Sequence, residues 1–90
     1  MSIQVLHSYP YNADPDHTTQ FKSVGLVDPP AELTSLPARL EYAFRVTQNV
    51  DEPWSKEGHR STSIGDRMWI DNELWQVFPV GWGRVDIDVP

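Results

Sequence analysis

The stretch RSTSIGDRMWIDNELWQVFPVGWGRV, residues 60–85, contains three of the four tryptophans and the clearest strand pattern of the chain. Apolar side chains recur at every second position on either side of a short polar segment, at Met68, Ile70, Trp75 and Val77. Since successive side chains of a strand point to opposite faces, this period is typical of a hairpin with one buried face. The stretch therefore predicts two paired strands, followed by a third extended segment at residues 80–85.

We expect the hairpin to turn at Asn72 and Glu73. A two-residue loop there places Ile70 opposite Trp75, whereas a pairing of Ile70 with Glu73 is expected to scatter the apolar residues over both faces. Asn72 tolerates the positive φ of a primed turn, but Glu73 does so less readily, so a looser loop around the same centre stays open.

Length and composition indicate one small domain, residues 1–90. A chain of 90 residues is close to the smallest size that folds without covalent or metal crosslinks. The absence of cysteine excludes disulfides and thiolate metal sites, so the four tryptophans must supply much of the burial. No apolar run approaches about 18 residues and no positively charged segment opens the chain, so a cytoplasmic protein is expected.

The chain is acidic. Its formal charge of −6, from thirteen acidic and seven basic residues, opposes nonspecific attraction to nucleic acid and to anionic lipid. We therefore expect no direct nucleic-acid binding and no membrane partner. A charged partner is expected to be basic.

Two strands are predicted ahead of the hairpin. Residues 3–7 and 21–27 have strand-like composition, and Gly25 is a weak point or a bulge in the second of them. Pro29 and Pro30 end this second strand, because proline restricts the backbone and has no amide donor.

One amphipathic helix is predicted between these strands and the hairpin. Ser35 is a suitable N-cap, and Pro37 is tolerated in the first turn. An apolar stripe at spacings of three and four is formed by Leu36, Leu40, Ala43, Phe44 and Thr47. The helix is expected over residues 36–49, with Asn49 ending it in the left-handed conformation.

These elements predict an α+β fold, a small antiparallel sheet of three to five strands with one amphipathic helix packed across one face. Helix and hairpin follow each other in sequence and each has one apolar face, so each can bury the other. Burial is marginal at this length, and a symmetric homodimer that covers the outer tryptophan face is a further expectation.

Three segments resemble a family of small proteins of actinobacterial phages and mobile elements. They are LEYAFRVTQNVDEPW (40–54), RSTSIGD (60–66) and VGWGRV (80–85), which together with the strand pair between them span about half the chain. Members of that family carry an AFRLTN-like helix, a tryptophan soon after it, an RSTSVGD box and a terminal GW or GF segment. The resemblance implies a phage accessory protein and no particular chemistry.

The RSTS box has two interpretations; it consists of Arg60, Ser61, Thr62 and Ser63. Its guanidinium, hydroxyls and backbone amides could bind a phosphate or a carboxylate. Alternatively, the box leads into the hairpin by a tight turn, in which Gly65 supplies backbone freedom and Asp66 bonds local amides. The two interpretations differ in whether Arg60 is open to a groove or paired with an acid.

The tryptophans divide between the two faces of the hairpin. Trp75 falls on the apolar face, whereas Trp69 falls on the opposite face beside Arg67. Trp54, Trp69 and Trp82 are together a candidate protein-binding patch, because large aromatic rings beside arginine dominate the binding energy of interfaces. The alternative is that these rings cover both sheet faces and seal the edges.

Signals of catalysis and of metal binding are weak. His7, His17 and His59 lack the spacing of metal ligands, and each is expected at the surface. There is no nucleophile elbow and no glycine-rich phosphate loop, and a pair of Asp66 and His59 matches no recognised arrangement. We expect a non-enzymatic protein with no catalytic residues, no metal and no cofactor.

Three functions of different classes are compatible with the sequence. The favoured one is a phage-type accessory protein that binds and modulates a host or phage protein. The second is an acidic mimic of nucleic acid that blocks a basic groove of a defence or replication enzyme, which predicts rows of exposed carboxylates. The third is a binder of a small phosphorylated ligand at the RSTS box.

Overall fold

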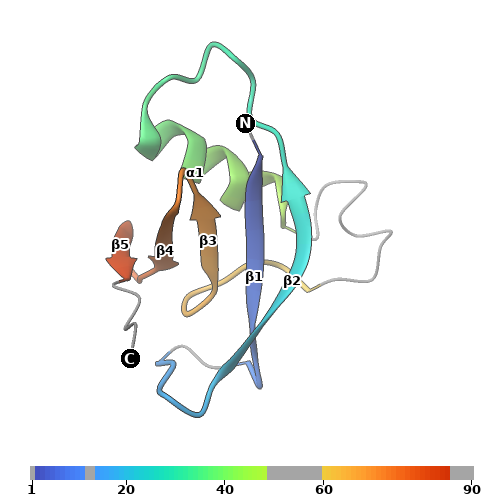
Figure 1. The fold of residues 1–90 in the computed structure, drawn as a ribbon, viewed down its shortest axis with the longest axis vertical. Helices are drawn as coiled ribbons and strands as arrows, with labels where there is room; N and C mark the ends of the chain where they lie inside the picture. Colours follow the sequence, from blue (N-terminus) through green and yellow to red (C-terminus); the bar gives the residue numbers. More distant parts are fainter. Residues whose placement is uncertain (1, 12–13, 49–59, 86–90) are drawn as a thin grey trace.

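The computed structural model describes residues 2–11, 14–48 and 60–85. These residues form a five-stranded antiparallel sheet, in the order β2-β1-β3-β4-β5, with one helix across one face (Figure 1). The elements are β1 (Ile3–Tyr9), β2 (Gln20–Val27), α1 (Leu36–Val46), β3 (Arg67–Ile70), β4 (Glu73–Val77) and β5 (Trp82–Val85). The expected α+β class, with a small antiparallel sheet and one helix, is confirmed.

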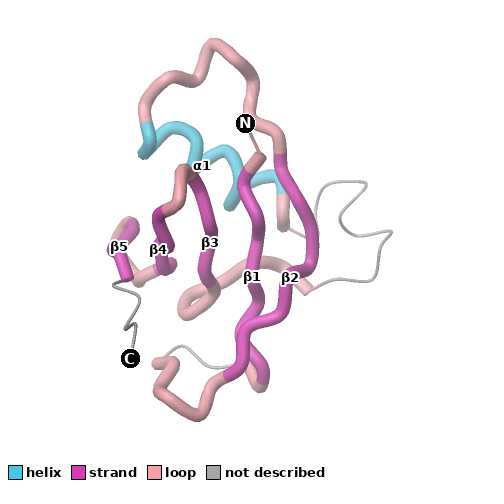
Figure 2. The backbone as a smooth tube through the Cα atoms, viewed as in Figure 1, coloured by secondary structure: helices cyan, strands magenta, loops and turns pink. Residues whose placement is uncertain are grey.

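The first strand lies inside the sheet, between β2 and β3. Its pairing with β2 contains an irregularity, because Val5 pairs with Gly25 whereas the next residue, Leu6, pairs with Ser23. Val24 is therefore an extra residue in β2, and the bulge expected at Gly25 lies directly beside it. Figure 2 shows β2 changing direction along its length and continuing with β1 beyond the end of β3.

The turn between β3 and β4 lies one residue earlier than the apolar pattern suggests. Asp71 (φ 52°) and Asn72 (φ 62°) occupy the turn, and Ile70 pairs with Glu73. The prediction of a loop at Asn72 and Glu73 is therefore wrong. Both central residues of this turn need positive φ, which the short side chains of aspartate and asparagine adopt more readily than glutamate does.

The face assignment of the hairpin is nevertheless confirmed. Moving the loop by one residue changes the pairing by two residues, so every side chain stays on its face. The expectation that pairing Ile70 with Glu73 scatters the apolar residues was wrong for the same reason. Met68 pairs with Trp75, and Met68 and Ile70 are 0% exposed.

The helix begins as expected and ends earlier. The Ser35 hydroxyl accepts a hydrogen bond from the Ala38 amide at 3.3 Å, which is the geometry of an N-cap. The last helical residue is Val46, so the predicted end at Asn49, which lies outside the described residues, is too late. Thr47 is the C-cap, and its hydroxyl donates to the Ala43 carbonyl at 2.8 Å. Side chains thus satisfy carbonyls that the helix leaves unpaired at its end.

The core lies between α1 and the sheet. Its buried apolar members are Ile3, Val5, Val27, Leu40, Ala43, Met68 and Ile70. Trp75 packs against this core, as predicted, and so does Trp82, whose ring meets Phe44 of the helix edge to face at 5.9 Å. The buried indole nitrogen of Trp75 makes no hydrogen bond to the described residues.

The turn geometry makes a prediction for Asn72. Asn72→Val should lower the free energy of unfolding by about 1–2 kcal/mol, because a β-branched residue resists positive φ, whereas Asn72→Gly should be neutral within about 0.5 kcal/mol. Urea titrations measure both values. At Leu74, an extended position of β4, the order should reverse, with valine tolerated better than glycine. Equal tolerance of valine and glycine at residue 72 would contradict the turn.

Candidate functional site

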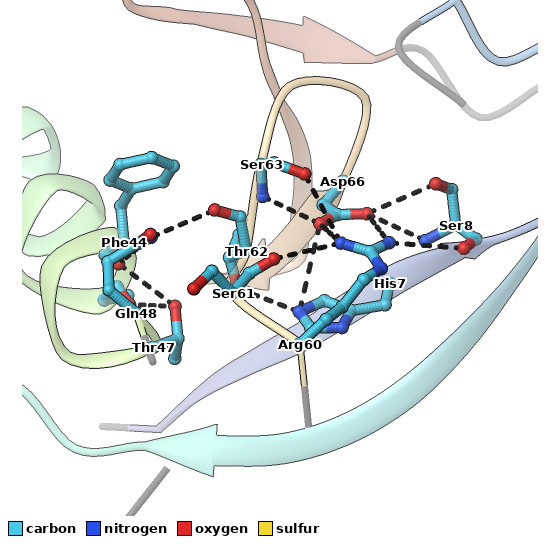
Figure 3. Close-up of polar contacts among 11 residues, drawn as sticks. His7, Ser8, Phe44, Thr47, Gln48, Arg60, Ser61, Thr62, Ser63 and Asp66 are labelled. Atoms are coloured by element: carbon cyan, nitrogen blue, oxygen red, sulfur yellow. Dashed lines mark hydrogen bonds and ion pairs between the residues drawn. The ribbon is translucent and has the colours of Figure 1, made fainter. Parts of the chain in front are cut away.

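Asp66 immediately precedes β3 and is 0% exposed. Its two carboxylate oxygens accept hydrogen bonds from the two terminal nitrogens of Arg60, at 2.6 and 2.7 Å (Figure 3). Such a bidentate pair fixes the orientation of both groups and is stronger than a bond between neutral partners. The positive charge of Arg60 in the RSTS box is therefore neutralised by Asp66, three residues after the box.

Further donors surround the carboxylate of Asp66. The backbone amides of Ser8 and Ser63 each donate to it at 2.9 Å. Burial alone raises the pKa of Asp66, but the hydrogen bonds from Arg60, Ser8 and Ser63 and the nearby His7 outweigh it and hold the pKa below its usual value. Asp66 is thus ionised and bonded in the folded protein.

The same segment is tied to the helix. The Thr62 amide donates to the Thr47 carbonyl at 3.1 Å, and the Gln48 side chain donates to the Thr62 carbonyl at 3.0 Å. On its other side, the Thr62 hydroxyl lies 2.9 Å from Nε2 of His7 in β1. We call His7, Ser8, Arg60, Thr62, Ser63 and Asp66 the Asp66 cluster. It connects β1, the end of α1 and the start of β3.

Arg60 is paired with an acid and not open to a ligand groove alone. Arg60 pairs with Asp66 and also donates to the carbonyls of Ser8 and Ser61, and Thr62 is buried. Gly65 has φ 95°, and Asp66 bonds the Ser63 amide, as the interpretation of a tight turn predicts. These contacts favour a structural role for the RSTS box over a phosphate site.

The histidines do not all lie at the surface. His17 is exposed and His59 lies outside the described residues, but His7 is only 4% exposed, so its predicted surface position is wrong. The strand pattern contained the signal, because residues 3, 5 and 7 of β1 share the buried face.

The buried hydroxyl, imidazole and carboxylate do not form a catalytic relay. A relay needs the carboxylate on one imidazole nitrogen and the nucleophile on the other. Here Nε2 of His7 faces both the Thr62 hydroxyl, at 2.9 Å, and Asp66 Oδ2, at 3.9 Å. Thr62 is also 1% exposed, which leaves no room for a substrate beside it.

The candidate tryptophan patch is divided by the sheet. Trp82 lies on the helix side, where it contacts Phe44, whereas Trp69 alternates with the buried Met68 and Ile70 and so lies on the opposite side. Trp54 lies outside the described residues. The structure therefore does not bring Trp69 and Trp82 onto one surface.

The sheet face opposite the helix is rich in apolar and aromatic side chains. We call it the outer face; its members include Leu6, Phe21, Leu26, Arg67, Trp69, Leu74 and Gln76. Arg67 lies over the Phe21 ring at 4.0 Å and donates to the Gln76 side chain at 3.0 Å. Leu26 is 68% exposed. Arginine and aromatic rings are thus held in place on the face of the sheet that α1 does not cover.

A groove of about 680 Å³ lies along the β1–β2 ribbon, next to the Asp66 cluster. It is lined by His7, Ser8, Tyr9, Pro10, Tyr11, Lys22, Ser23, Val24 and Arg60. Its walls come from three separate segments that only the fold brings together, so no local sequence pattern predicts it.

Two structural features are absent from the described residues. Within residues 2–11, 14–48 and 60–85, no three histidine or acidic side chains gather as metal ligands. In the same part of the chain, no helix has the length and apolar character needed to cross a membrane.

Comparison of the chain with protein-family models, with curated proteins and with solved structures gives no match. The resemblance to phage proteins thus rests on the three sequence segments alone, and a function has to be inferred from the surfaces described above.

The Asp66 cluster makes a prediction for acid stability. Because the pKa of Asp66 is lowered by folding, its stabilising contribution is complete above the unfolded pKa of about 3.9 and is lost as the pH falls through the folded value. Asp66→Asn should lower the free energy of unfolding at pH 7 by on the order of 3 kcal/mol, since it leaves Arg60 without its counter-charge. The difference from wild type should shrink below about pH 4.

Urea titrations at pH 7, 5, 4 and 3 measure this difference. Asp28→Asn is the matched control, because Asp28 is exposed and bonds only the Ser2 hydroxyl among the described residues. This variant should follow the wild type at each pH. A difference between wild type and Asp66→Asn that stays constant down to pH 3 would rule out an ionised, bonded Asp66.

Proposed function

We propose that this chain is a small non-catalytic accessory protein, of the phage type that its sequence resembles, and that it binds and modulates another protein through the outer face of its sheet. The observation that carries the proposal is the composition of that face. An antiparallel sheet with one covered face usually presents alternating polar residues to water on the other. Here the polar side chains of that face, Gln4, Arg67 and Gln76, are accompanied by the half-buried Trp69, Leu6 and Leu74 and by Leu26, which is 68% exposed.

The outer face also has the residue types that dominate interface energetics. Tryptophan and arginine are enriched among the residues whose truncation weakens complexes most. Trp69 and Arg67 lie two positions apart in β3, and Arg67 is already oriented by Phe21 and Gln76. An oriented side chain loses less conformational entropy on binding, so this arrangement favours an interface.

A different protein is a better occupant of this face than a second copy. Each chain carries a formal charge of −6, so two copies repel each other at long range, whereas a partner with a basic surface is attracted. The homodimer expected from the sequence is the competing outcome, and sedimentation distinguishes the two.

The acidic-mimic function has less support. A mimic needs exposed carboxylates in rows, but the exposed acids of the described residues are spread over separate loops, the helix and the hairpin turn: Asp14, Asp16, Asp28, Glu32, Glu41 and Asp71. Asp71 is also paired with Arg39 at 3.8 Å. Among the described residues this scatter is typical of a solvated surface.

Affinity capture tests the outer face. Tagged wild-type protein should retain a host or phage protein that Trp69→Ala retains at least about thirtyfold less tightly, the equivalent of about 2 kcal/mol. Glu41→Ala and Arg45→Ala are matched controls on the exposed side of α1, and both should retain the partner. Equal capture by wild type and Trp69→Ala would exclude this face.

The two hairpin tryptophans should respond differently to the same substitution. Trp75→Ala removes a ring that packs on the core and should cost about 3–5 kcal/mol of stability. Trp69→Ala should cost clearly less, because its ring lies on the outer face. Thermal melts with matched circular dichroism spectra compare them. Collapse of Trp69→Ala with an intact Trp75→Ala would mean that the outer face is the real core.

A further inference from the structure

The groove beside the Asp66 cluster lies where the β1–β2 ribbon extends past the rest of the sheet. The last pair between β1 and β3 is Leu6 with Arg67, whereas β1 and β2 stay paired as far as Tyr9 and Gln20. One side of the groove is therefore this two-stranded extension. The opposite side is formed by Tyr11 and by Arg60, which leads into the Asp66 cluster. Its volume of about 680 Å³ is within the range of small-molecule sites.

Two exposed tyrosine rings border the groove. Tyr9 is 64% exposed and Tyr11 is 62% exposed. A cation lies against each ring, Lys22 Nζ at 5.5 Å from the Tyr9 centroid and the Arg60 guanidinium at 4.8 Å from the Tyr11 centroid. These contacts restrict the rings without burying them, so the rings offer stacking surfaces to a ligand.

The two cations differ in their availability. The charge of Arg60 is compensated by Asp66, whereas the exposed Lys22 ammonium pairs with no acid of the described residues. His7 is buried and bonded to Thr62. Lys22 is therefore the charge of this groove that a ligand can use, and it is a positive charge on a protein of formal charge −6.

We infer that this groove binds a small planar ligand that carries an anionic group, of the size and chemistry of a mononucleotide. The planar ring stacks against Tyr9 and Tyr11, and the anionic group pairs with the Lys22 ammonium. The ligand contacts of this site, Tyr9, Tyr11 and Lys22, are not residues of the outer face, so the inference does not depend on the protein-binding function.

A lysine in an edge strand also has a simpler role. β2 lies at the edge of the sheet, and charged side chains there discourage pairing with other chains. That role explains why Lys22 is exposed, but it requires neither the groove nor the two tyrosines that converge on it. An experiment can distinguish protection of the sheet edge from ligand binding, because only ligand binding depends on Tyr11.

The probes are adenosine monophosphate, uridine monophosphate and flavin mononucleotide. Adenosine, which lacks the phosphate, and inorganic phosphate, which lacks the ring, are tested separately. Titrations are followed by amide shifts of labelled full-length protein, which locate the site. Lys22→Gln removes the charge, and Tyr11→Leu removes one ring without changing β2. Arg45→Gln is the matched control, because Arg45 is an exposed cation over another ring, that of Tyr42 at 5.7 Å.

At least one nucleotide should give saturable shifts at Tyr9, Tyr11 and Lys22, with adenosine and phosphate weaker. Lys22→Gln and Tyr11→Leu should each weaken binding roughly tenfold or more, the effect of losing a contact to a charged group or a stacked ring, and Arg45→Gln should leave it unchanged. The inference is overturned if no nucleotide saturates the groove, if phosphate binds as tightly as the nucleotide, or if Arg45→Gln and Lys22→Gln have equal effects.

Discussion

The ion pair between Asp66 and Arg60 is the interaction on which the rest of the structure depends. Asp66 has no contact with water, so its charge is tolerable only because Arg60 and two backbone amides satisfy it. Those donors come from β1 and from the segment before β3. The carboxylate thus fixes how the first strand, the hairpin and, through Thr62, the end of the helix meet.

The main elements could be predicted because their signals are local. A period of two identified the buried face of the hairpin, and a stripe of period near four together with Ser35 located the helix start. The predicted turn was wrong by one residue. Pairing Ile70 with Glu73 or with Trp75 leaves the same side chains on the buried face, so the period of two does not distinguish the two registers. Only the φ preference of Asp71 and Asn72 selects between them.

The site could be predicted only in part, because its contacts join distant segments. The sequence predicts that Arg60 is either open to a groove or paired with an acid and that Asp66 bonds local amides, but nothing near Ser8 in the sequence indicates that its amide reaches Asp66. The groove likewise depends on Tyr9 and Lys22 facing each other across two strands. A carboxylate that needs donors from two distant segments leaves no local pattern.

The central position of β1 has a consequence for synthesis of the chain. β1 leaves the ribosome before the other strands of the sheet, yet one of its two neighbours is β3, which is made after β2 and α1. Until then β1 has an open edge, and the Ser8 amide has no carboxylate to bond. The nascent protein therefore passes through a stage in which a half-finished sheet is open to pairing with other chains, and that stage ends once residues 60–70 have left the ribosome and β3 pairs with β1.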